Sequence, residues 1–77
     1  MTLHEAFGAV LKKARKEAGV SQDQLAFDSN LDRTYISLLE RGLRQPSLST
    51  IFSLAEGLKY QPYRLVEDTE KFFVATS

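Results

Sequence analysis

Residues 21–42 read SQDQLAFDSNLDRTYISLLERG, and this stretch decides how the rest of the chain is interpreted. Ser21 and Gln24 have the spacing of a capping box, in which side chains bond the free backbone amides at a helix start. Asn30 is one of the few residue types that tolerates a left-handed backbone, and Asp32 is a favoured N-cap for a following helix. The stretch therefore predicts two short helices joined by a tight turn.

Capping and helix-starting residues outside this stretch predict three more helices. Thr2 opens another capping box, so a first helix is expected over residues 2–18. Ser47 is the expected N-cap of a fourth helix, and Pro62 has the preset dihedral of a first helical position. The fifth helix is expected to be short, over residues 62–67.

Apolar residues recur at helical spacing in these segments, which predicts a compact all-α fold of five helices. The expected core positions are Leu3, Phe7, Val10, Leu11 and Ala14 in the first helix, Tyr35, Ile36 and Leu39 in the third, and Leu48, Ile51, Leu54, Ala55 and Leu58 in the fourth. We expect one domain over residues 1–68 and a C-terminal tail over 69–77. The tail contains Phe72 and Phe73 without caps, so a frayed end, a helix extension and a pairing strand all remain open.

Length and composition exclude several classes of function. A chain of 77 residues has room for a single core. It has no cysteine and one histidine, which argues against a disulfide scaffold and a metal site, and no pattern indicates a cofactor or an enzyme's nucleophile. Its longest apolar run, residues 72–75, is too short to cross a membrane, so a cytoplasmic protein without a membrane partner is expected.

The net charge of zero predicts no general attraction to nucleic acid. Positive residues are nevertheless clustered, at residues 12–16 and again at Arg33, Arg41 and Arg44. On charge alone, a solvated surface is favoured over a phosphate-binding one because acidic residues are interspersed.

The helix expected after Asp32 carries a stronger indication. At 100° per residue, its outward side is polar and basic, while Tyr35, Ile36 and Leu39 share the opposite side. The major groove of DNA admits one helix, whose outward face must touch base edges while its inward face is held by a core. Two short helices with this pattern are what a DNA-reading helix-turn-helix requires.

The chain resembles the phage-repressor helix-turn-helix family, the Cro/C1 or XRE type. The resemblance rests on RKEAGVSQDQLA at residues 15–26, LDRTYISLLERG at 31–42 and PSL at 46–48, and it extends over residues 3–66. Within the family, the run DRTYIS looks most like the controller proteins of restriction-modification systems. Asn30 stands where the family usually has glycine, and Leu38 where related repressors often carry a polar residue.

The resemblance implies a lambda-repressor-like fold and assigns roles to particular residues. The implied base contacts in double-stranded DNA are Arg33, Thr34, Ser37 and Leu38, and the implied phosphate contacts are Gln22, Tyr35, Arg41, Arg44 and Ser47. The family pattern also implies a structural ion pair between Arg15 and Glu40.

A single module of this kind makes few base contacts, so the resemblance implies a homodimer on a pseudo-palindromic operator. The candidate interface residues are Phe52, Tyr63, Leu65, Val66, Phe72 and Phe73. The expected function is sequence-specific transcriptional regulation, and the alternative is a protein-interaction module, such as an antitoxin or a coactivator-like adaptor, on the same fold.

Overall fold

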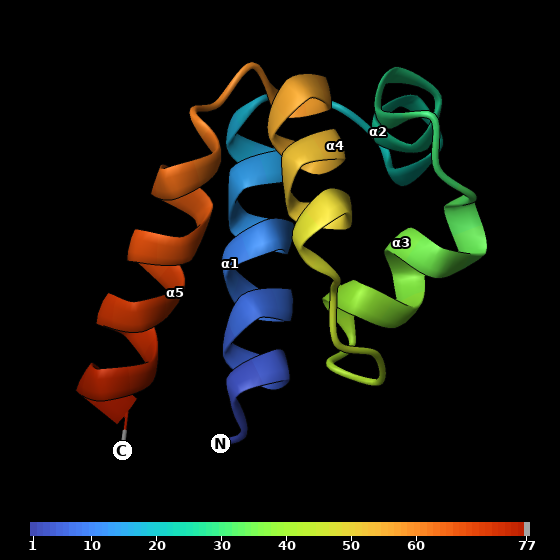
Figure 1. Cartoon of the computed structure of the whole chain (residues 1–77). Coiled ribbons are helices and arrows are strands. Elements are labelled where there is room, and N and C mark those ends of the chain that lie inside the picture. The colour runs from blue at the N-terminus through green and yellow to red at the C-terminus, as the bar shows by residue number, and fades with distance from the viewer. Residues whose placement is uncertain (77) are drawn as a thin grey trace.

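The computed structural model describes residues 1–76, and this part of the chain forms five α-helices (Figure 1). The helices are α1 (Leu3–Glu17), α2 (Gln22–Ser29), α3 (Arg33–Glu40), α4 (Leu48–Leu58) and α5 (Pro62–Thr76). α1 packs against α3 and α5, and α4 packs against α2 and α5. The predicted all-α fold of five helices is therefore confirmed.

Local hydrogen bonds start and stop the helices where the sequence predicted. Glu5 N donates to Thr2 Oγ1 at 3.2 Å, and Thr2 N donates to Glu5 Oε1 at 2.7 Å, which completes the first capping box. Ser21 and Asp32 cap α2 and α3, and Asn30 has the left-handed backbone expected of the turn, with φ of 56°. The two helices of the predicted helix-turn-helix are thus fixed by contacts within a few residues of their ends.

The capping box also perturbs one carboxyl group. The hydrogen bonds that Glu5 accepts from the backbone amide and the hydroxyl of Thr2 lower its pKa below the ordinary value. A lowered pKa in the folded state adds stability above the unfolded pKa, and this contribution is lost as the pH falls through the folded pKa.

The core takes large side chains from all five helices. Those with no accessible surface are Leu11, Leu25, Ile36, Leu39, Leu54 and Leu65. The prediction that Leu65 lies in a dimer interface was therefore wrong, because its side chain is fully buried in the core of its own subunit. Leu3 and Leu48 were expected in the core but are 53% and 71% exposed, and each is the first residue of its helix.

α5 is longer than the sequence predicted. It was expected to end near Glu67 but continues to Thr76, so a helix extension is the correct one of the three possibilities for these residues. The helix packs along α1, and the Thr69 hydroxyl donates to the Leu65 carbonyl at 2.7 Å. No glycine or proline follows Pro62 to stop the helix. Ser77 lies outside the described residues.

One glycine determines how closely α1 can approach α3. A Cβ at Gly8 would overlap the backbone carbonyl of Leu39 and lie 2.8 Å from that of Glu40. Only glycine allows the two backbones this contact, which brings the end of α3 close to the middle of α1.

Among residues 1–76, no helix is long and apolar enough to cross a membrane.

Candidate nucleic-acid interface

α3 presents its polar residues to solvent and its apolar residues to the core. Arg33 and Thr34 are exposed, and Ser37 and Leu38 are half-buried, whereas Ile36 is fully buried. The structure thus brings the four expected base-contacting residues together on one short helix. None of them is turned into the core.

An exposed ion pair joins the starts of α2 and α3. Arg33 Nε lies 3.3 Å from Asp23 Oδ1, and the two side chains are 63% and 76% exposed. A pair so open to solvent contributes little stability, so the guanidinium can exchange this partner for another at small cost. Sequence reasoning missed Asp23, because only the folded turn brings residues ten positions apart together.

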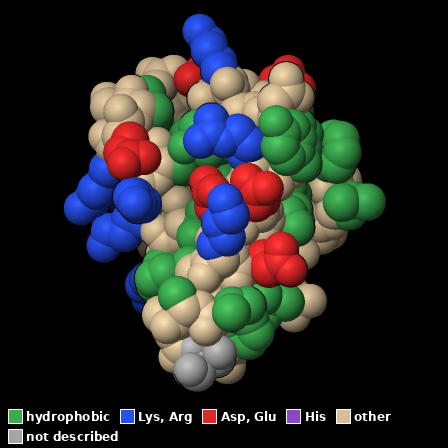
Figure 2. All heavy atoms as spheres, turned by 90° about the vertical axis from the view of Figure 1, so that its left-hand side faces the viewer, with side chains coloured by type: hydrophobic (Ala, Val, Ile, Leu, Met, Phe, Trp, Pro, Cys, Tyr) green, Lys and Arg blue, Asp and Glu red, His purple; other side chains and the backbone are tan. Residues whose placement is uncertain are grey.

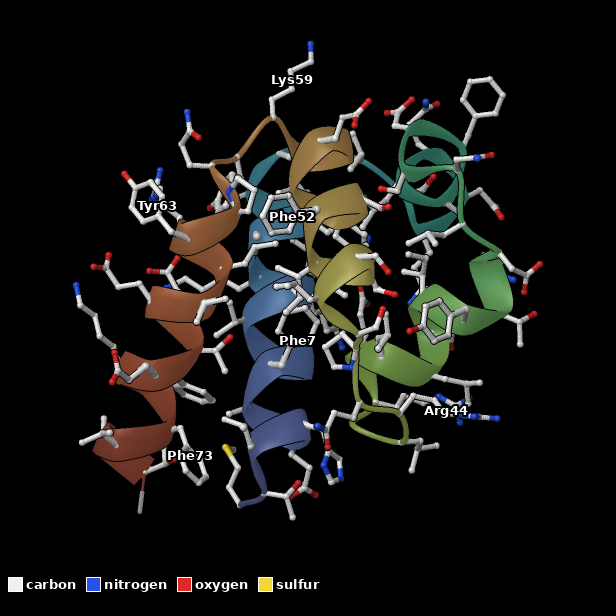
Figure 3. All side chains as sticks on the ribbon, in the orientation of Figure 1. Phe7, Arg44, Phe52, Lys59, Tyr63 and Phe73 are labelled. Carbon is white, nitrogen blue, oxygen red and sulfur yellow. The ribbon has the colours of Figure 1, made fainter. Side chains whose placement is uncertain are left out.

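The expected phosphate-contacting residues border α3 on three segments. Arg41 caps the end of α3, Arg44 is exposed in the following loop, and Ser47 caps the start of α4. Figure 3 shows the Arg44 side chain extending beside the end of α3. A helix N-terminus with free amides and an adjacent cation is a favourable place for an anion.

Tyr35 occupies both the core and the edge of this surface. Its ring packs against the core, and its hydroxyl lies 3.2 Å from Thr50 Oγ1, which in turn lies 2.9 Å from Ser47 Oγ. This chain of hydroxyl groups ties α3 to the first turn of α4. Sequence reasoning missed Thr50, although its position three residues after the Ser47 N-cap was a usable signal.

A buried ion pair lies on the inner side of α3. Arg15 Nε donates to Glu40 Oε2 at 2.6 Å and Arg15 Nη2 to Glu40 Oε1 at 3.1 Å, while Nη1 donates to the Val20 carbonyl at 2.9 Å. The side chains are only 11% and 3% exposed. The hydrogen bonds to Glu40 raise the pKa of Arg15 above its ordinary value. The structure therefore contains the ion pair that the family resemblance implied.

Gln22 belongs to the same cluster. Its Nε2 donates to Glu40 Oε1 at 3.0 Å, a contact that sequence reasoning did not foresee. Because Gln22 is the first residue of α2, the cluster joins α1, the start of α2 and the end of α3. The Glu40 carboxylate thus links both helices of the helix-turn-helix to α1.

A second candidate surface lies on α4 and α5. Phe52, Tyr63 and Val66 are 56%, 64% and 49% exposed. Figure 3 shows Phe52 and Tyr63 on the same side of the molecule, and in Figure 2 apolar side chains gather along that edge. We call these three residues the apolar patch. Phe72 is 36% exposed and Phe73 is half-buried, and both lie toward the far end of α5.

No group of acidic or histidine residues within 1–76 is arranged to hold a metal ion. What the site offers instead is a capped polar helix flanked by arginines and by the start of α4. This arrangement defines a helix-turn-helix domain of the kind that reads DNA.

The sequence profile described as "Helix-turn-helix" matches residues 11–65, which is most of the chain. The chain therefore belongs to the helix-turn-helix family. It is 41% identical over 64 residues to the control protein C.BamHI of Bacillus amyloliquefaciens, with 82% of this chain and 79% of that protein covered.

Solved structures of controller proteins are similar in both sequence and fold. The restriction-modification controller protein C.AhdI from Aeromonas hydrophila is 44% identical, with a TM-score of 0.78 over 80% of this chain and 94% of that one. The controller protein C.Esp1396I, solved as a tetramer with its natural 35 base-pair operator, is 35% identical. Its TM-score is 0.86, over 96% of this chain and 97% of that one.

Proposed function

We propose that this protein is a sequence-specific transcriptional regulator that binds a pseudo-palindromic operator as a homodimer, with α3 in the major groove. The observation that carries the proposal is the two-sidedness of α3, whose polar residues are exposed while Ile36 and Leu39 are fully buried. The operator complex of the relative C.Esp1396I supports the same function. No catalytic role is proposed, and we propose a cytoplasmic location for the protein.

Sequence reading is assigned to residues on α3. Arg33 is long enough to donate two parallel hydrogen bonds to the O6 and N7 atoms of a guanine. Thr34 offers a methyl group for thymine and a hydroxyl, and Ser37 is small enough to let the helix approach the bases. Leu38 can add only an apolar contact.

Positioning on the DNA backbone is assigned to residues around α3. Arg41, Arg44 and Ser47 are exposed and can reach phosphates together with the free amides that open α4. Gln22 and Tyr35 are half-buried and already make internal hydrogen bonds. Gln22 keeps its second Nε2–H for a phosphate oxygen, and the single O–H of Tyr35 can donate to a phosphate when Thr50 Oγ1 is the donor in their hydrogen bond.

Dimerisation is assigned to the apolar patch. Large apolar side chains that are half exposed or more on one side of a small protein are typical of an interaction surface. Binding to two half-sites on one face of the DNA requires a two-fold dimer whose α3 helices lie about 34 Å apart, which is one turn of DNA. Phe72 and Phe73 are proposed to extend this interface at its edge.

The experiment that tests the function is selection of bound sequences from random double-stranded DNA, followed by titration of the selected operator at several salt concentrations. We expect two inverted half-sites and an affinity that falls steeply with salt, because phosphate contacts release counterions. If no sequence is enriched and affinity stays at background at every salt concentration, the chain is a protein-interaction module instead.

A second measurement tests the dimer. Val66→Glu would place a charge in the apolar patch while leaving the core unchanged, so we expect a monomer in analytical ultracentrifugation. Asp28→Asn, at an exposed carboxylate of α2 outside the patch, is the control and should leave the dimer intact. A dimer that persists in Val66→Glu would exclude the apolar patch as the interface.

A further inference from the structure

A groove of about 530 Å³ runs between α1 and α5. Its small or apolar lining residues are Ala9, Val10 and Ala14 of α1, Phe72 of α5, and Tyr60 of the segment that joins α4 to α5. Figure 2 views the molecule from the side of α5, with Lys and Arg at one edge, basic and acidic side chains together across the middle, and apolar side chains at the other edge. None of the residues proposed to contact DNA lines this groove.

The groove is also lined by charged residues of both signs, of which Lys71 is paired with Glu67 and the other four are in no ion pair of the described part of the chain. Lys13 and Glu17 come from α1, and Arg64 and Asp68 come from α5. Among residues 1–76, the ion pairs are Arg15 with Glu40, Arg33 with Asp23 and Lys71 with Glu67, so none of these four residues is in one. The Arg64 guanidinium lies over the Tyr60 ring, with its Cζ atom 4.7 Å from the ring centroid.

We propose that this groove binds a small zwitterionic ligand with an apolar side chain, that is, an amino acid or a short peptide. A ligand carrying only a carboxylate would meet Glu17 and Asp68, and one carrying only an ammonium group would meet Lys13 and Arg64. A ligand with both groups can pair with charged residues of both signs. Its side chain would cover the apolar lining residues, and the volume of the groove is within the usual range for small-ligand sites.

The groove and the apolar patch use different sides of α5. At 100° per residue, Arg64, Asp68 and Lys71 point to one side of the helix, whereas Tyr63 and Val66 point to another. Phe72 is the one residue that both lines the groove and is proposed to lie at the edge of the dimer interface. Ligand binding can be measured on the full chain without DNA, so a failure of the proposed DNA binding and a failure of ligand binding are distinguishable.

The test is titration of the ¹⁵N-labelled protein with L-phenylalanine, followed by two-dimensional NMR. Two probes of nearly the same shape each lack one charge: 3-phenylpropionate has no ammonium group, and phenethylamine has no carboxylate. We expect saturable shifts centred on Ala9, Val10, Ala14 and Phe72, with both one-charge probes binding about fivefold more weakly. The dipeptide leucyl-phenylalanine distinguishes a free amino acid from a short peptide as the ligand. Tighter binding of the dipeptide than of L-phenylalanine identifies a peptide site.

Substitutions of the charged groove residues test which of them pairs with each charged group of the ligand. Asp68→Asn is expected to weaken L-phenylalanine about fivefold and to tighten 3-phenylpropionate by relieving a like-charge contact, and Arg64→Gln to weaken both. Glu70→Gln, an exposed carboxylate of α5 outside the groove, is the control and should change neither. Equal binding of all three probes, no saturable shifts, or shifts centred on Phe52 and Tyr63 would each overturn the proposal.

Discussion

Arg15 and Arg33 are the same residue type, and both face a carboxylate, yet the protein uses them in opposite ways. Arg15 is enclosed between α1 and α3, with two bonds to Glu40 and one to the Val20 carbonyl. Arg33 stands at the exposed start of α3, with a single 3.3 Å approach to Asp23. The comparison teaches that burial decides whether an arginine holds the helices in place or remains free to contact another molecule.

The energetic consequences differ in kind. Removing one partner of a buried pair leaves the other charge without solvent or partner, which is costly. Removing an exposed arginine leaves an aspartate that water solvates at once. The inner face of α3 should therefore control stability, and its outer face should control affinity for DNA.

The largest effect is expected from Arg15→Ala. It should lower the free energy of unfolding by about 3 kcal/mol, because the buried Glu40 carboxylate would lose its cation and keep only the neutral amide of Gln22 as a partner. Urea denaturation followed by circular dichroism measures the change. Arg33→Ala is the matched control and should stay within about 0.5 kcal/mol of the unchanged protein. Equal stability losses in the two variants would contradict the division between the faces.

The second largest effect is expected on DNA affinity rather than on stability. Arg33→Ala should weaken binding to the selected operator about tenfold or more for each half-site, while removing preference at one base pair. Fluorescence anisotropy with the operator and with single-base variants measures both quantities. An equal loss on every DNA sequence would make Arg33 a phosphate contact rather than a base contact.

A smaller effect is expected at Ser29, which is buried on the scaffold side between α2 and α4. Its hydroxyl has no hydrogen-bond partner among residues 1–76 and lies against Gly57. Ser29→Ala should raise the free energy of unfolding by about 1 kcal/mol, since it removes an unpaired buried polar group. Thr69→Val is the control, because the Thr69 hydroxyl is buried but bonded and its loss should not stabilise. A destabilised Ser29→Ala variant would show that the hydroxyl has a partner.

The smallest effect is expected from Asp23→Asn. It releases Arg33 and removes a negative charge beside the DNA surface, so operator affinity should rise about twofold to fivefold at low salt. The gain should vanish at high salt because both side chains are exposed. Asp28→Asn, another exposed carboxylate of α2, is the control in the same anisotropy titration. Lower affinity in Asp23→Asn would instead show that Asp23 holds Arg33 in its binding position.

The sequence determined the parts of this protein that depend on neighbours within a few residues. Thr2, Ser21, Asp32 and Ser47 cap their helices as predicted, and Asn30 adopts the left-handed turn. The two-sided pattern of α3 was also readable, because its spacing follows from helix geometry alone. The family pattern added the ion pair between Arg15 and Glu40, which composition and spacing could not have supplied.

The tertiary structure decided what depends on distant segments lying together. Leu65 and Val66 are neighbours of similar apolarity, and only packing against the other helices buries one and exposes the other. The length of α5, the bond from Gln22 to Glu40, the Asp23 and Arg33 pair, and the groove beside α1 were unpredictable for the same reason. Caps and periodicity are encoded within a few consecutive residues, whereas contacts between helices exist only once the chain has folded.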